Sequence, residues 1–225
     1  MRPLFPSFPG LLPSLLMGVL LGAASANAQP FSFGLKGGLP MTDFLNTAQS
    51  GNFSFASNTN RYIVGPTAEL RLPFGLGVEI DILYRHFSYT GSGGTTGITT
   101  AFLNSSTTAN AWEFPLLAKY RFPGKIIHPY VDGGVAWDTL SGLTQAVTST
   151  VAGITSRSSS GNPPELANST SRGFVLGAGI SVKALVVRIS PEIRYTRWGA
   201  RHFLDANGLL SSNQNQAEFL LGITF

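Results

Sequence analysis

Apolar and polar residues alternate with a period of two in eight segments of this chain, which is the spacing of side chains on the two faces of a β-strand. Leu76 to Arg85 is typical, because its even-numbered residues are apolar and Glu79 and Asp81 stand between them. We therefore predict eight strands, each roughly 9–14 residues long and close to the length that a tilted membrane strand needs. They cover residues 31–39, 61–72, 76–85, 112–122, 127–138, 173–182, 187–195 and 216–225.

Short and long connections between these segments also alternate. Tight turns are expected at Pro73–Gly75, Pro123–Lys125 and Lys183–Leu185, and the longer stretches are rich in Ser, Thr, Asn and Gly. Outer-membrane barrels have short periplasmic turns and long external loops. The order therefore predicts an all-β fold, an eight-stranded antiparallel up-and-down transmembrane β-barrel with short periplasmic turns and four long external loops. These loops would span residues 41–60, 88–110, 139–171 and 199–214.

Charged residues recur at the centres of the predicted strands, on the polar side. In a soluble β-sandwich they would form a solvated face, whereas in a barrel they would fill the lumen and the apolar rows would meet lipid. Two roles stay open for such a cluster: a plug of ion pairs that fixes strand register, or a gated path for small ions. The narrow interior of eight strands favours the plug. The cluster comprises Glu69, Arg71, Glu79, Asp81, Arg85, Glu113, Lys119, Arg121, Arg188, Glu192, Arg194 and Glu218.

Aromatic residues and prolines in the predicted strands bear on whether the fold is a membrane barrel or a soluble sandwich. Aromatic residues gather near predicted strand ends, where interfacial girdles are expected: Phe31, Tyr84, Trp112, Phe122, Trp137, Tyr195 and Phe225. Four prolines fall inside predicted strands, where each removes a backbone donor, and we expect bulges or strand ends near the rim at Pro66, Pro115, Pro129 and Pro191. Leu83 and Leu117 also fall on the polar side, against the pattern.

The N-terminus has the layout of a secretory signal peptide. Arg2 precedes an apolar run from Leu11 to Gly22, and Ala26-Asn27-Ala28 supplies a small-x-small cleavage pattern. A membrane anchor is the alternative, but the run is short and holds Pro13. We predict a signal peptide at 1–28, cleavage after Ala28, and a barrel domain at 29–225.

Composition narrows the function classes. Charged residues make up 12 % of the chain, against about 25 % in a typical soluble protein. The absence of cysteine excludes disulfides, metal–thiolate sites and thiol nucleophiles. The net charge of +4 is mild and its residues are scattered, so no nucleic-acid partner is expected.

Several stretches resemble the porin-like, eight-stranded outer-membrane β-barrel family, similar in shape to the transmembrane domain of outer-membrane protein A. They are Phe33–Gly38, Glu113–Tyr120, Pro129–Gly134, Pro191–Tyr195 and the terminal Phe225. The resemblance implies the outer membrane of a Gram-negative-type envelope, with its lipids, the barrel-assembly machinery and periplasmic chaperones as partners. It also implies that Phe219 and Phe225 belong to the assembly signal in the last strand.

Candidate chemistry is sparse. The histidines are His86, His128 and His202, and only His202 has an acid nearby in sequence, Asp205 in the fourth long loop. No nucleophile, base and orienting group can be assembled around them. We expect no enzyme, no cofactor and no metal site. The first hypothesis is a structural and surface-interaction barrel. A narrow channel is the second, and a barrel enzyme using His202 and Asp205 is the third.

Overall fold

The computed structural model describes residues 30–57, 61–95, 100–184 and 186–225. The predicted signal peptide and its cleavage site at Ala28 lie outside these residues, and the strands belong to one unit, Phe31–Phe225. No helix among the described residues is long and apolar enough to cross a membrane.

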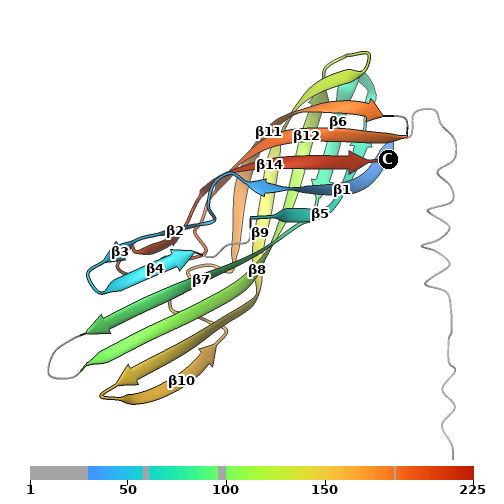
Figure 1. The fold of residues 1–225 in the computed structure, drawn as a ribbon. Helices are drawn as coiled ribbons and strands as arrows, with labels where there is room; N and C mark the ends of the chain where they lie inside the picture. The colour runs from blue at the N-terminus through green and yellow to red at the C-terminus, as the bar shows by residue number, and fades with distance from the viewer. Residues whose placement is uncertain (1–29, 58–60, 96–99, 185) are drawn as a thin grey trace, which may run out of the picture. The chain divides into compact units, whose positions relative to one another are not determined.

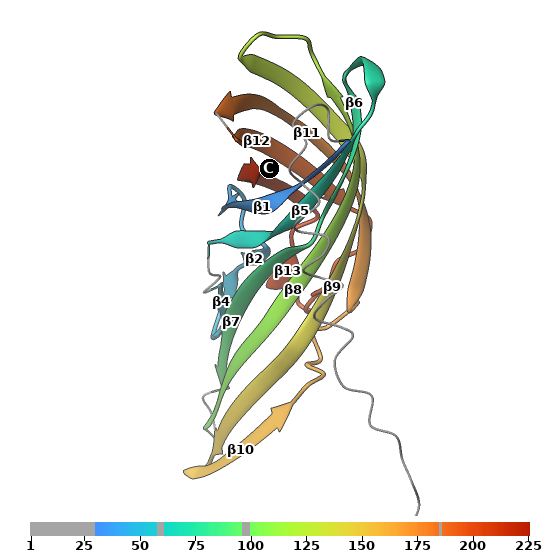
Figure 2. The same ribbon diagram turned by 90° about the vertical axis from the view of Figure 1, so that its right-hand side faces the viewer.

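Eight antiparallel strands close into a barrel (Figures 1 and 2). The last strand pairs with the first, Leu35 standing opposite Ile223, so the ladder returns to its start. This confirms the predicted all-β, eight-stranded barrel. In order around it the strands are β1 (Phe31–Pro40), β5 (Ile63–Arg71), β6 (Leu76–Asp81) with β7 (Leu83–Thr95), β8 (Ala101–Arg121), β9 (Ile127–Val151), β11 (Thr170–Ala184), β12 (Val187–Trp198) and β14 (Asn215–Thr224).

The burial pattern is the reverse of a soluble β-sandwich. Along β1, Leu35 is 63 % exposed, whereas the next residue, Lys36, is 3 % exposed. The same alternation of exposed apolar and buried charged residues runs along β6, β12 and β14. A sandwich in water would bury the apolar row. The exposed apolar rows therefore suit a lipid environment, and the charged rows face the lumen.

Aromatic side chains mark both ends of the apolar band. Tyr84 and Trp112 lie side by side, their ring centroids 5.0 Å apart, and Trp137 is exposed on the next strand. Near the short turns, Tyr120 packs edge-on against Phe122, also at 5.0 Å. Trp112 in β8 and Phe122, which directly follows β8, stand near opposite ends of the band, as interfacial girdles do. The predicted girdle residues Phe31, Tyr195 and Phe225 are exposed as well.

The predicted turns at Pro73–Gly75 and Pro123–Lys125 lie between β5 and β6 and between β8 and β9. Of the third predicted turn, Lys183 and Ala184 still belong to β11, and Leu185 lies outside the described residues. Residues Pro73–Gly75 form a single 3-10 turn, η1, in which Phe74 and Gly75 have φ values of 65° and 81°. Gly75 also needs to lack a side chain, because a Cβ there would lie 2.3 Å from the Arg121 carbonyl oxygen.

The long connections differ from the prediction. Much of 88–110 and 139–171 is not loop but continued strand, since β7 runs on to Thr95, β8 begins at Ala101 and β9 reaches Val151. They were assigned to loops for their polarity, but their Thr, Phe and Val residues favour strands and pair in continuous register. Beyond the barrel they form an open sheet in the order β10 (Ile154–Ser160), β9, β8, β7, β4 (Phe53–Ser57), β3 (Gln49–Ser50). Figure 1 shows this sheet projecting from one end of the barrel.

Of the strand prolines, Pro66 and Pro115 mark neither a bulge nor the rim, whereas Pro129 is the third residue of β9 and lies at a strand end, as predicted. Pro66 lies inside β5 opposite Ile82, the residue between β6 and β7, whose N–H donates to the Pro66 carbonyl at 3.0 Å. Pro115 is paired with Ala136 within the same continuous register. The missing N–H groups interrupt individual hydrogen bonds and leave the register unchanged. The register shift in the β8–β9 ladder lies elsewhere, between Thr108 and Asn110.

Candidate functional site

The lumen holds charged residues in three groups along the barrel. The group nearest the short turns surrounds Glu69, which forms ion pairs with Arg121 and, at 3.6 Å, with Arg71. Arg188 lies nearby, and its Nη1 is buried without a hydrogen-bond partner among the described residues. Three guanidinium groups thus share one carboxylate, which makes this end of the lumen cationic.

The central group is the most deeply buried. Arg194, with an exposure of 0 %, donates to Glu192 at 2.7 Å and forms an ion pair with Asp81 at 2.9 Å. Lys36 reaches Asp81 and Glu192, each at 3.1 Å, and also Glu79. On the facing strands Lys119 forms ion pairs with Glu79 and, at 3.8 Å, with Asp132. Three cations and four carboxylates therefore neutralise one another in a space without room for their hydration shells.

The third group lies towards the long hairpins. Arg85 donates to Glu113 at 2.8 Å, to Glu218 at 2.6 Å and to the side chain of Gln216 at 3.2 Å. One arginine on β7 thereby connects β8 with β14, on the far side of the barrel. Such a cross-lumen pair constrains the relative positions of strands that are not hydrogen-bonded neighbours.

Apolar side chains lie among the charged groups. Leu83 packs with Ile63 and Leu220, and Leu117 packs with a second set that includes Val175 and Trp198. The two leucines that broke the polar pattern therefore face the lumen as well, where they fill the space that charged side chains leave.

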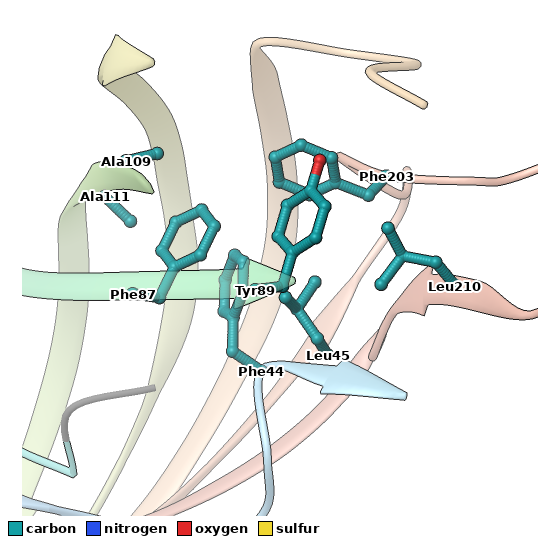
Figure 3. Close-up of a cluster of buried hydrophobic side chains, with 8 residues drawn as sticks. All are labelled: Phe44, Leu45, Phe87, Tyr89, Ala109, Ala111, Phe203 and Leu210. Carbon is teal, nitrogen blue, oxygen red and sulfur yellow. The ribbon is translucent and has the colours of Figure 1, made fainter. Parts of the chain in front are cut away.

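A larger apolar cluster closes the lumen at the long-hairpin end (Figure 3). Phe44 lies 4.6 Å from Phe87 between ring centroids, and Phe203 meets Tyr89 edge-on at 5.4 Å. Phe44 and Phe203 come from loop segments near β2 (Leu45–Thr47) and β13 (Leu210–Ser212), two short strands that pair with each other. These loops therefore fold back over the barrel mouth. The cluster comprises Phe44, Leu45, Phe87, Tyr89, Ala109, Ala111, Phe203 and Leu210.

All twelve residues of the predicted charge cluster occur in these groups, and all except Arg188 have an ion-pair partner among the described residues. Three further members, Lys36, Asp132 and Asp138, were not assigned to the cluster. Their places on the polar side of their strands would have identified them, since they have the same parity as the other lumen residues.

His202 pairs with a different acid from the one expected. Its Nε2 lies 2.9 Å from Asp138 Oδ2 and its Nδ1 lies 2.7 Å from the Asn168 carbonyl oxygen. Asp205 instead accepts a hydrogen bond from the Asn207 backbone N–H at 3.0 Å, within its own turn. The proposed His202–Asp205 pair is therefore wrong, because closure of the barrel brings β9, not the neighbouring turn, to the imidazole.

The contacts of His202 favour its protonated state. Both partners are acceptors, so each ring nitrogen must donate, which only the imidazolium can do. Burial lowers the pKa of His202, but the hydrogen bond and charge of Asp138 and the Asn168 carbonyl oppose it, and the net pKa lies above the usual 6.5. No nitrogen remains free to act as a general base. Among the described residues no acidic, His or Cys cluster could hold a metal ion either.

Removal of a central cation should destabilise the barrel far more than removal of a surface cation. Arg194→Leu leaves buried carboxylates unpaired and should lower the free energy of unfolding by about 3–5 kcal/mol. Arg61→Leu, which breaks the exposed Arg61–Asp43 pair, should cost about 0–1 kcal/mol. Urea titration in lipid vesicles measures both, and Arg194→Lys, which keeps the charge, should be intermediate. Equal losses for Arg194→Leu and Arg61→Leu would show that the central pairs do not stabilise the fold.

The loop that carries His202 should be held more firmly at low pH. A raised folded pKa means that the stabilisation is fully present below the unfolded value of about 6.5 and is lost as pH rises through the folded pKa. Amide hydrogen exchange in residues 199–209, corrected for intrinsic rates, should therefore increase as the pH is raised through the folded pKa of His202. His202→Gln should remove this dependence and His128→Gln should keep it. An unchanged pH profile in His202→Gln would contradict the assignment.

Comparisons with known proteins agree with the fold. The family model for the outer membrane protein beta-barrel domain matches residues 25–200. No curated protein sequence matches the chain significantly.

Solved structures of low similarity were also found. Neisserial surface protein A (NspA) is 14 % identical, with 88 % of this chain and 97 % of that chain covered and a TM-score of 0.40. The N-terminal β-barrel domain of Pseudomonas aeruginosa OprF is 15 % identical, with coverages of 88 % and 100 % and a TM-score of 0.34. Ail, the attachment invasion locus protein of Yersinia pestis, is 9 % identical, with coverages of 87 % and 96 % and a TM-score of 0.29. TM-scores this low assign no function.

Proposed function

Because this chain belongs to the outer membrane protein β-barrel domain family, we propose that it is an outer-membrane barrel with a structural and surface-interaction role, a plugged lumen and long hairpins displayed outside the cell. The observation that carries this proposal is the open sheet that continues the barrel beyond its aromatic girdle. The location in the outer membrane follows from the family; the role and the sidedness are the proposal.

The hairpins extend far beyond the membrane. β8 begins 11 residues before Trp112, and β9 continues 14 residues past Trp137. At about 3.3 Å per residue, these lengths correspond to roughly 35–45 Å of strand. A barrel whose role was confined to the membrane would need no such extension.

The projecting sheet has a surface suited to contact with other molecules. Every residue of β10, Ile154–Ser160, is exposed, and five of the seven are Ser or Thr with Arg157 as the one charge. Because β10 is an edge strand, its outer backbone groups face away from the sheet and can pair with an extended segment of a partner. Hydroxyl groups and a free edge favour recognition by hydrogen bonds over charge.

The contents of the lumen support a plug. Ion pairs cross the central lumen, and Leu83 and Leu117 contribute apolar layers beside them. An eight-stranded barrel has an interior that side chains can fill completely. We infer that a continuous path for ions is blocked at the central group and again at the apolar cluster around Phe44 and Phe203.

An epitope inserted in the chain tests the proposed sidedness and role. At the Ala152–Gly153 turn that joins β9 to β10, it should bind antibody on intact cells. At Gly124, in a short turn, it should bind only after the outer membrane is permeabilised. Labelling at Gly124 on intact cells would overturn the sidedness.

Replacement of Val147–Ser158 by a two-residue Asn-Gly turn should keep the barrel but reduce attachment of cells to surfaces. Unchanged attachment and envelope integrity would overturn the interaction role.

We infer that β14 carries the signal for barrel assembly, acting with the assembly machinery and periplasmic chaperones. Phe219 in β14 is 43 % exposed and Phe225, which directly follows β14, is 69 % exposed. β14 also makes the closing contact with β1. Phe225→Ala should lower the amount of folded protein in the outer membrane several-fold, whereas Phe31→Ala, an exposed aromatic at the same end, should not. Equal amounts of heat-resistant protein in both variants would contradict this role.

A further inference from the structure

The lipid-facing surface of the barrel has an unusual distribution of charge. In the described parts of the eight barrel strands, only two charged residues have outward parity, Arg172 in β11 and Arg197 in β12. All other charged strand residues face the lumen; Lys183, for instance, is paired with Arg188 and shares its side. Both outward charges are cations, and they lie on neighbouring strands.

These two arginines lie at the level of the aromatic girdle. Arg172 stands directly opposite Trp137 on β9, and Arg197 stands opposite Phe174 on β11. Arg197 is also two residues beyond Tyr195 in the direction of the long hairpins. A charge on the lipid face of a barrel is tolerated only near the interface, so their position suits the headgroup layer.

Two adjoining hollows open at this place. One of 540 Å³ and one of 450 Å³ share Trp137, Arg172 and Gly199 in their walls, and the second is also lined by Phe174 and Arg197. Gly199, which lacks a side chain, contributes to the space between the arginines. The aromatic girdle therefore contains two hollows beside Arg172 and Arg197.

The arginines lack anionic partners within the described residues. Arg197 donates to the side-chain oxygen of Asn215 at 2.6 Å. Within the part of the chain that the structure describes, no side-chain hydrogen bond or ion pair is found for Arg172. Asp138 borders the first hollow, but its carboxylate is bound by His202. Two guanidinium groups with donors to spare are suited to a phosphate, which accepts the paired N–H groups of arginine.

An apolar strip continues from the arginines towards the middle of the membrane. Phe174, Leu176 and Ile193 are 73 %, 66 % and 57 % exposed on the same two strands. A ligand that meets both features has a phosphate at one end and hydrocarbon at the other.

We propose that Arg172 and Arg197 bind the phosphate of an anionic lipid headgroup, with the acyl chains of that lipid lying along Phe174, Leu176 and Ile193. Under the sidedness proposed above, this lipid belongs to the outer leaflet. Binding itself requires only that the barrel lie in a bilayer, so it can fail or succeed independently of that sidedness.

Quenching of tryptophan by brominated lipids tests the site. The mature protein with Trp112→Phe, which leaves Trp137 as the lipid-facing tryptophan and Trp198 buried in the lumen, is folded into phosphatidylcholine vesicles. Brominated phosphatidylglycerol should quench it at a several-fold lower mole fraction than brominated phosphatidylcholine. Arg172→Gln/Arg197→Gln should abolish this preference. The control, Arg61→Gln/Arg157→Gln, removes two exposed cations outside the barrel strands and should retain it.

Each remaining outcome counts against the site. No preference for phosphatidylglycerol in the parent protein would overturn the proposal, and equal losses in the two double variants would reduce it to general attraction by positive charge. Inorganic phosphate at millimolar concentration should not compete; full competition would show an ion site in place of a lipid site. Far-UV circular dichroism of each variant establishes that the barrel is folded.

Discussion

The structure depends on the requirement that a backbone in hydrocarbon satisfy its own hydrogen bonds. A β-sheet meets this requirement only when its first and last strands pair, as Leu35 does with Ile223. Closure then divides every strand into an outer row, which must be apolar, and an inner row. All charge in the strands, apart from Arg172 and Arg197, is thereby directed into a lumen too narrow to hydrate it.

Confinement of the charges explains their arrangement. A buried ion is tolerated when its partners are close and its remaining hydrogen bonds are satisfied, and Arg194, Lys36 and Arg85 each contact three acidic or polar groups. Seven lysine and arginine side chains in the three groups and eight carboxylates, including Asp138, share the lumen. The imidazolium of His202 adds a positive charge beside Asp138. Its loop therefore contributes a cation to the barrel as well as covering the mouth.

Much of this architecture could be predicted from the sequence, because the period of two is a local property that assigns each residue to a face. The same parity would have placed Lys36, Asp132 and Asp138 in the lumen. It could not show that Leu83 and Leu117 form packing layers there, since this depends on which strands face each other across the barrel. Polarity was a poor guide for residues 139–151, which have the composition of a loop but contain β-branched residues that continue the ladder of β9. The pairing of His202 with Asp138 could not be predicted from the sequence, because the two residues are 64 positions apart and meet only when the barrel closes.

The central claim is that paired charges and apolar layers fill the closed barrel. Planar-bilayer recording of the purified, folded mature protein tests it most directly, with a general porin in the same membranes as the reference. We expect no discrete conductance steps from this protein under conditions in which the porin gives them. Reproducible single-channel steps from folded protein would contradict it and would show that the charged groups line an open path.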